Sequence, residues 1–196
     1  MKKLLLALGA ALLVAPATRA DSEFSVVLQG GASHYTSALS SGSDTGAAYG
    51  ARFGILPTPM LGIELGYLGT QNNVSESLSS GRLSSTIKTN EGYGDVRLNI
   101  LPGAFTPYVF GGYGRTWVSG AAASGIPDRS VNTLPFGGGL EANAGAFKIG
   151  GRFQYNYLFD RIYTGSNAGT TTSIGADKGG NSDFWGVSLD VGASFR

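Results

Sequence analysis

The sequence predicts an all-β protein, an eight-stranded antiparallel up-and-down transmembrane β-barrel. Three observations support this fold class. Residues 1–20 have the layout of an export signal, and the chain after them alternates between apolar and polar or small residues with a period of two. The connections between the alternating segments are short and long in turn, as expected of a barrel with tight turns on one side of a membrane and loops on the other.

The composition excludes several other classes. Glycine accounts for 32 of the 196 residues, and only 14% of the residues are charged. Because glycine costs a helix interior about 1 kcal/mol relative to alanine, a helical bundle is disfavoured. The chain has no cysteine, and His34 is its only histidine. A disulfide scaffold, a cysteine nucleophile and a thiolate or His-rich metal site are therefore excluded, and no cofactor is expected.

The first 20 residues are predicted to be a cleaved signal peptide. Lys2 and Lys3 precede an apolar run over residues 4–14, and small residues follow. We expect cleavage after Ala20, with Ala17 as the alternative, which leaves residues 21–196 as the barrel domain. Loss of Lys2, Lys3 and Arg19 takes the formal net charge from +1 to −2. Such a chain has no electrostatic footprint for nucleic acid.

Eight segments alternate with the period of a strand: residues 24–29, 47–55, 61–67, 92–100, 108–118, 136–143, 147–157 and 185–195. In the first, Phe, Val and Leu share one face. The second sets five apolar residues against a face that carries Arg52, and the third sets four against a face with Glu64. The fourth sets Val, Leu and Ile against Asp95 and Arg97.

The second half of the chain repeats this pattern. The fifth segment is rich in glycine, and its face assignment is less clear than the others. The sixth places Glu141 among glycines, and the seventh sets six apolar or small residues against a face with Lys148 and Arg152. The last segment opposes an aromatic and aliphatic face to one with Asp190.

The connections are of two kinds. The short ones carry proline or glycine, at residues 57–59, 102–104 and 144–145. The long ones are rich in Ser, Gly, Asn and Thr, at roughly residues 36–45, 71–85, 119–133 and 160–183. Because the two kinds alternate, both chain termini should lie at the periplasmic end and the four long loops should face outside.

A sheet in hydrocarbon must pair every backbone polar group, so it has to close into a barrel. Closure leaves one face of each strand against lipid and the other inside the lumen. The apolar faces should meet lipid, and the charged faces should meet inside the lumen. The expected lumen charges are Arg52, Glu64, Glu91, Asp95, Arg97, Arg115, Glu141, Lys148, Arg152 and Asp190. Because buried unpaired charges are costly, these should form a network of ion pairs that plugs the barrel.

Aromatic residues near the strand ends are predicted to form interfacial girdles. For the outer interface the pattern selects Tyr49, Tyr67, Tyr155, Tyr157 and Trp185. For the periplasmic interface it selects Phe24, Tyr108, Phe147 and Phe195.

The chain resembles the small eight-stranded outer-membrane barrels, above all the OmpA-like and OmpX-like barrel domains. The resemblance rests on the export signal, the eight alternating segments, the run Pro-Tyr-Val-Phe-Gly-Gly-Tyr-Gly over residues 107–114, and the aromatic last strand. The chain departs from the family's usual pattern in that Arg196 follows Phe195. It resembles the single-domain members, so no periplasmic peptidoglycan-binding domain is expected. The resemblance implies a bacterial outer-membrane location, a monomer, contact with outer-membrane lipid and lipopolysaccharide, and biogenesis through the barrel-assembly machinery.

Two functions from different classes follow. The first is a structural or surface-interaction protein, without enzymatic activity, that displays four extracellular loops from a charge-plugged barrel. The alternative is a narrow channel or a barrel that binds a small hydrophobic ligand, as in OmpW-like proteins. A third possibility, a lipid hydrolase, would need His34 and a serine on one face, but Ser33 is its neighbour and should point to the opposite side.

Overall fold

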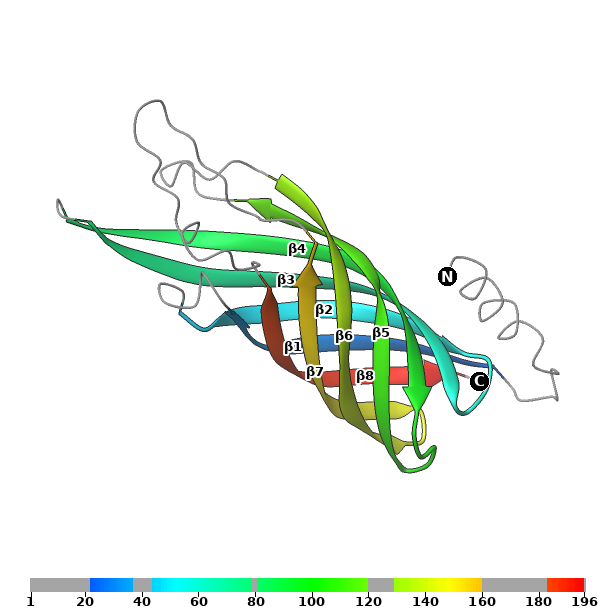
Figure 1. Cartoon of the computed structure of the whole chain (residues 1–196). Coiled ribbons are helices and arrows are strands. Elements are labelled where there is room, and N and C mark those ends of the chain that lie inside the picture. The colour runs from blue at the N-terminus through cyan, green and yellow to red at the C-terminus, as the bar shows by residue number, and fades with distance from the viewer. Residues whose placement is uncertain (1–21, 37–43, 79–80, 120–128, 160–182, 196) are drawn as a thin grey trace, which may run out of the picture.

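The computed structural model describes residues 22–36, 44–78, 81–119, 129–159 and 183–195. These form eight antiparallel strands that close into a barrel, with each strand paired to the next and β8 paired to β1 (Figure 1). The predicted fold class is therefore confirmed. Among the described residues, no helix is long and apolar enough to cross a membrane. The predicted signal peptide lies outside the described residues and stays a prediction.

The strands are longer than the alternating segments that predict them. Their bounds are β1 Glu23–Tyr35, β2 Gly46–Leu56, β3 Leu61–Leu78, β4 Gly81–Asn99, β5 Phe105–Ser119, β6 Arg129–Ala144, β7 Phe147–Leu158 and β8 Phe184–Phe195. The extra residues continue the same pairing with neighbouring strands. The pairing is interrupted between β5 and β6, at Gly112 and Tyr113, and otherwise leaves few backbone groups along the wall without a partner.

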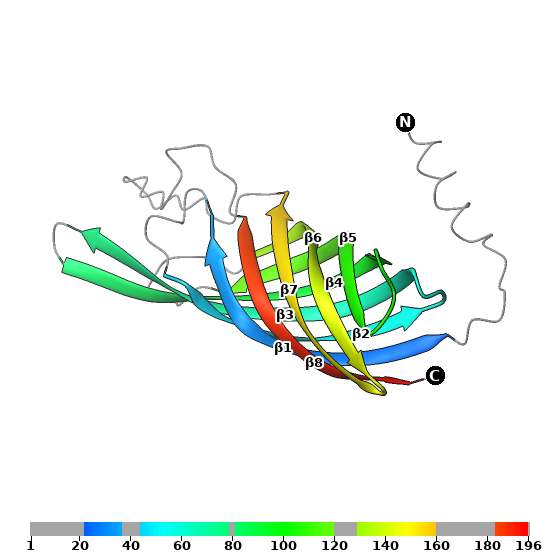
Figure 2. The ribbon, with the colours of Figure 1, turned by 90° about the horizontal axis from the view of Figure 1, so that it is seen from below.

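The two ends of the barrel differ. At the turn end, short connections over residues 57–60, 100–104 and 145–146 lie beside the start of β1 and the end of β8. At the opposite, loop end, β3 and β4 reach well beyond the other strands (Figures 1 and 2). Leu78 pairs with Gly81 at the tip of this hairpin. The expectation of a long loop over residues 71–85 is wrong, because strand pairing continues where composition predicts a loop, and β6 likewise starts at Arg129 within the expected loop 119–133.

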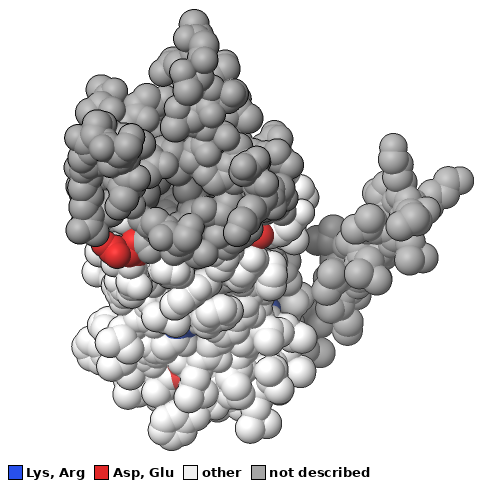
Figure 3. Space-filling view, turned by 60° about the vertical axis from the view of Figure 1, so that its left-hand side comes forward, with Lys and Arg blue, Asp and Glu red and all other residues white. Residues whose placement is uncertain are grey.

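The outer wall is apolar and the lumen is polar at the turn end. Along β1, for example, Val26 and Leu28 are exposed, whereas Ser25 and Gln29 are buried. On the face that Figure 3 shows, the described part of the wall is almost free of charged side chains. A wall of this kind is the reverse of a water-soluble protein's surface and suits a hydrocarbon solvent.

Near the loop end an apolar cluster lies in the lumen, among buried polar side chains such as Asn72, Thr116 and Asn156. Tyr35 and Phe184 lie with ring centroids 5.6 Å apart, and each has only 1% of its surface exposed. The other members of the cluster are Ala48, Leu68, Ile87, Tyr93, Val118, Val131 and Leu158. The barrel interior therefore has two layers, with an apolar layer towards the loop end and a charged layer towards the turn end.

Candidate functional site: the lumen charge network

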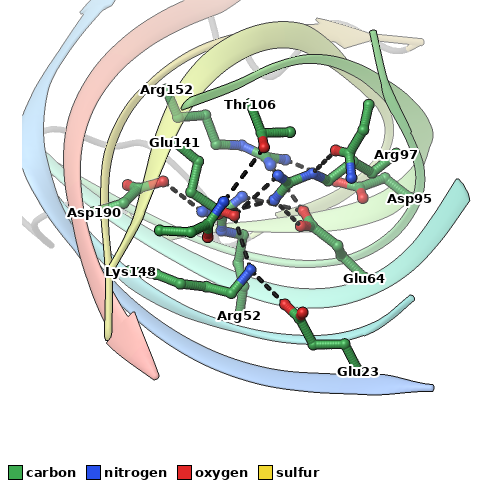
Figure 4. Close-up of polar contacts among 12 residues, drawn as sticks. Glu23, Arg52, Glu64, Asp95, Arg97, Thr106, Glu141, Lys148, Arg152 and Asp190 are labelled. Atoms are coloured by element: carbon green, nitrogen blue, oxygen red, sulfur yellow. Dashed lines mark hydrogen bonds and ion pairs between the residues drawn. The ribbon is translucent and has the colours of Figure 1, made fainter. Parts of the chain in front are cut away.

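Glu64 on β3 lies at the centre of the charged layer. Its two carboxylate oxygens accept hydrogen bonds from three guanidinium groups on three strands: Arg52 at 3.1 Å, Arg97 at 3.3 Å and Arg152 at 2.9 Å. The side chain of Glu64 is only 4% exposed. Figure 4 shows the side chains converging across the barrel axis.

Two aspartates complete the pairing of Arg152 and Arg52. The Nη2 atom of Arg152 lies 2.7 Å from Asp95 on β4. The corresponding Nη2 of Arg52 is paired with Asp190 on β8. Both arginines thus join a carboxylate of another strand to Glu64, and this arrangement ties β2, β3, β4, β7 and β8 together.

A second branch extends towards the turn end through Glu141. Arg97 contacts both oxygens of Glu141, at 3.0 and 3.2 Å, the two-pronged geometry that makes arginine–carboxylate pairs strong. Lys148 adds a contact of 2.8 Å to Glu141 and one of 2.7 Å to Glu23 on β1. In the described chain, four cations and five carboxylates make up this network.

Aromatic rings of β5 lie against the guanidinium groups. The Arg97 Cζ atom is 3.8 Å from the ring centroid of Tyr108, and the Arg152 Cζ atom is 3.3 Å from that of Phe110. A Cβ atom built on Gly139 of β6 would come within 2.6 Å of the Tyr108 ring, so this glycine makes room for it. The assignment of Tyr108 to the periplasmic girdle is wrong, because its ring is 3% exposed and fills the lumen as a cation–π partner.

The assignment of Arg115 to the lumen is also wrong. Arg115 is exposed on the outer wall and donates a hydrogen bond of 2.6 Å to the Ser130 hydroxyl. The register sets its side: Asp95 is paired with Gly112, and Gly112 and Arg115 are an odd number of residues apart on β5. Paired residues share a face of a sheet, so Arg115 must point away from the lumen that Asp95 faces.

The structure places every other predicted lumen charge inside the barrel. Those in the network are Arg52, Glu64, Asp95, Arg97, Glu141, Lys148, Arg152 and Asp190. Glu91 is buried as well but lies nearer the apolar layer and joins no ion pair there. Sequence reasoning missed Glu23, which stands just before the first alternating segment. It also missed the apolar layer, although Leu158 and Phe184 lie next to the predicted segments.

The remaining predicted girdle residues lie on the outer wall. At the loop end Tyr49, Tyr67 and Tyr157 are exposed, and Tyr155 and Trp185 are half-buried. At the turn end the exposed rings are those of Phe24, Phe147 and Phe195. Three further rings at the loop end were not predicted: Tyr113, Trp117 and Phe159.

Ser33 and His34 point to opposite sides of β1, as predicted. The Ser33 hydroxyl is buried in the lumen and donates to Asn72 at 3.1 Å. The His34 ring lies beside Trp185, with ring centroids 5.8 Å apart. These two residues therefore do not form a nucleophile–base pair, which requires hydrogen-bond contact.

The described part of the lumen contains a small cavity. A lumen cavity lined by Gln29, Leu68, Arg152 and Gln154, among others, has a volume of about 20 Å³. Such a volume holds about one water molecule. Each guanidinium group bridges carboxylates on different strands, so the arrangement holds these charges in fixed pairs across the lumen.

Comparison with known proteins gives the class of this fold. No protein-family model matches the chain, and no curated protein matches it. Among solved structures, it is similar to Neisserial surface protein A (TM-score 0.60, 16% identity, 88% of this chain and 97% of that one). It is also similar to Ail, the attachment invasion locus protein of Yersinia pestis (TM-score 0.56, 16% identity, 90% of this chain and 100% of that one). The N-terminal barrel domain of Pseudomonas aeruginosa OprF is a third match (TM-score 0.51, 14% identity, 87% of this chain and 97% of that one).

These three structures are small outer-membrane barrels. Together with the closed eight-stranded sheet and its apolar outer wall, they define the class: this chain has the fold of the small eight-stranded outer-membrane β-barrels.

Proposed function

We propose that this protein spans the bacterial outer membrane as a sealed barrel and acts as a structural or surface-interaction protein through its loop end. The observation that carries the proposal is the ion-pair network around Glu64, which closes the lumen with paired charges. The apolar layer supports it from the other side. If the lumen is sealed, the projecting β3–β4 hairpin is the described feature best placed to meet a partner. The proposal gives the chain no catalytic role.

Single-channel conductance of the refolded residues 21–196 in a planar bilayer tests the seal. We expect no stable conductance, because Arg52, Arg97 and Arg152 would each have to leave a buried carboxylate to open a path. Heat-modifiable gel mobility serves as the control for folding. Discrete, ion-selective openings would contradict the seal and favour the narrow-channel alternative.

We further propose that Arg115 binds phosphate groups of outer-membrane lipid, including lipopolysaccharide. It lies on the outer wall between the exposed rings of Tyr113 and Trp117, at the level of the aromatic girdle. A charge on the lipid face costs about 2–4 kcal/mol at the bilayer midplane but close to zero near the interface. Arginine has five N–H donors, and the Ser130 hydroxyl occupies one Nη atom. A lipid phosphate would satisfy the others.

Thermal unfolding in bilayers of two compositions tests this contact. The wild-type midpoint should be higher in bilayers containing lipopolysaccharide than in phosphatidylcholine alone, and Arg115→Gln should lose at least half of that gain. In phosphatidylcholine, whose single phosphate is offset by its own choline cation, the same variant is the control and should fall only slightly below the wild type. An undiminished gain for Arg115→Gln would argue against the contact.

The barrel is expected to work as a monomer, assembled by the barrel-assembly machinery.

A further inference from the structure

Glu91 is a buried carboxyl group that the ion-pair network does not use. It lies on β4 between the charged and the apolar layers and has no exposed surface. Within the described part of the chain it forms no ion pair, since each lumen arginine and lysine is paired with other carboxylates. An isolated buried carboxylate is very costly, so Glu91 needs a positive partner or a proton.

Most side chains around Glu91 are neutral, and charged groups approach it from two directions. Across the strand pairs it faces Leu68 of β3 and Thr116 of β5. The charged groups that reach it are Arg152 of β7 and Asp95 of its own strand, and these two are paired with each other. Arg152 is therefore not free to neutralise Glu91.

A chain of hydrogen bonds on β7 determines what Glu91 meets. The Nε atom of Arg152 donates to Oε1 of Gln154 at 3.2 Å. The amide nitrogen of Gln154 then donates to Oδ1 of Asn156 at 2.9 Å. Because a guanidinium group can only donate, Arg152 sets the orientation of the Gln154 amide, and Gln154 sets that of Asn156.

In this orientation, Asn156 presents an oxygen to Glu91. The oxygen lies 3.2 and 3.1 Å from the two carboxylate oxygens of Glu91. Turning the Asn156 amide would bring its NH2 group to Glu91, but would also set it 2.9 Å from the NH2 group of Gln154. Two acceptors at this separation require a hydrogen between them, and Glu91 is the group that can carry it.

We propose that Glu91 is a proton-binding site, held as a neutral carboxylic acid that donates to Oδ1 of Asn156. Its other hydrogen bond comes from the Thr133 hydroxyl at 2.9 Å, which a neutral carboxyl group accepts equally well. The bound proton also removes one negative charge from a lumen in which the described carboxylates outnumber the cations.

The site couples a proton to the charge network. If Glu91 ionised, its oxygens would repel the Asn156 oxygen, and the Asn156 and Gln154 amides would both have to turn. Arg152 would then lose its Nε contact to Gln154, although it also holds Glu64 and Asp95. The bound proton thus helps to keep the charged layer in its closed arrangement.

Infrared spectroscopy of the refolded barrel at neutral pH tests the proposal. A protonated carboxyl group has a carbonyl stretching band separate from those of carboxylates, and the difference spectrum between wild type and Glu91→Gln isolates Glu91. We expect this band in the wild type, its loss in Glu91→Gln, and its retention in the control Glu64→Gln. Absence of the band from the difference spectrum would overturn the proposal.

Urea unfolding gives a second, independent measurement. Glutamine has the shape and hydrogen-bonding capacity of a neutral glutamic acid, so Glu91→Gln should leave the unfolding midpoint unchanged. Glu64→Gln should lower it, because three arginines lose their shared carboxylate charge. An equal loss for Glu91→Gln would show that Glu91 is ionised. A wild-type midpoint that rises with Na⁺ or K⁺ at constant ionic strength, and does not rise in Glu91→Gln, would identify a metal cation in place of the proton.

Discussion

Reversal of Arg152 to glutamate is expected to destabilise the barrel more than any other single charge change. Arg152 contacts Glu64 at 2.9 Å and Asp95 at 2.7 Å, with its guanidinium group against the Phe110 ring. Removing one partner of a buried ion pair typically costs about 3–5 kcal/mol. Arg152→Glu should cost more, because it also sets a third carboxylate beside Glu64 and Asp95.

Urea unfolding of the refolded protein in lipid vesicles, followed by tryptophan fluorescence, measures this effect. Arg115→Glu is the matched control, since it makes the same substitution on the outer wall. In phosphatidylcholine vesicles the control should change the free energy of unfolding by less than about 1 kcal/mol. Similar losses for the two variants would mean that the charges around Arg152 are not paired in the folded barrel.

Truncation of Phe184 to alanine is expected to have the second-largest effect. Phe184 is 1% exposed and packs on Tyr35 inside the apolar layer. A phenylalanine-to-alanine change in a packed interior costs about 3–5 kcal/mol, because the cavity left behind collapses only in part. The charged layer lies further towards the turn end and stays intact, so the variant should remain closed to ions.

Phe153→Ala provides the control for this prediction. Phe153 is 46% exposed on the outer wall, where lipid can fill the space that the ring vacates. Unfolding midpoints of the two variants should therefore differ clearly, with Phe184→Ala the less stable. Equal midpoints would mean that the rings inside the loop end add no more stability than those on the wall.

The site could be predicted in composition but not in connectivity. Charge on one face of an alternating strand identifies Arg52, Glu64 and Arg152 as lumen residues from sequence, because hydrocarbon does not accept such side chains. That Glu64 joins three arginines depends on where β2, β4 and β7 stand around the barrel. Strand order and register set these positions, and neither is encoded within a single segment.

The two wrong assignments on β5, those of Tyr108 and Arg115, have the same origin. In residues 108–118 both faces carry aromatic side chains, so alternation does not distinguish the lipid face from the lumen face. Charge is then the only sequence signal that predicts the side of Arg115, and it wrongly favours the lumen. Pairing with β4 determines which face of β5 is turned to the lumen, since Gly112 stands opposite Asp95. Tyr108 then faces inward beside Arg97, in space that Gly139 leaves open.

The amino-acid sequence is enough to predict the fold class, the number of strands, and which side chains of most strands face the lumen. These follow from period-two alternation and from the exclusion of charge from hydrocarbon, which act on each segment separately. Four features are visible only in the folded barrel: the ion pairs, the extent of the β3–β4 hairpin, the faces of β5 and the acceptor that Glu91 meets. These depend on contacts between strands distant in sequence, whose register is set only when the barrel closes.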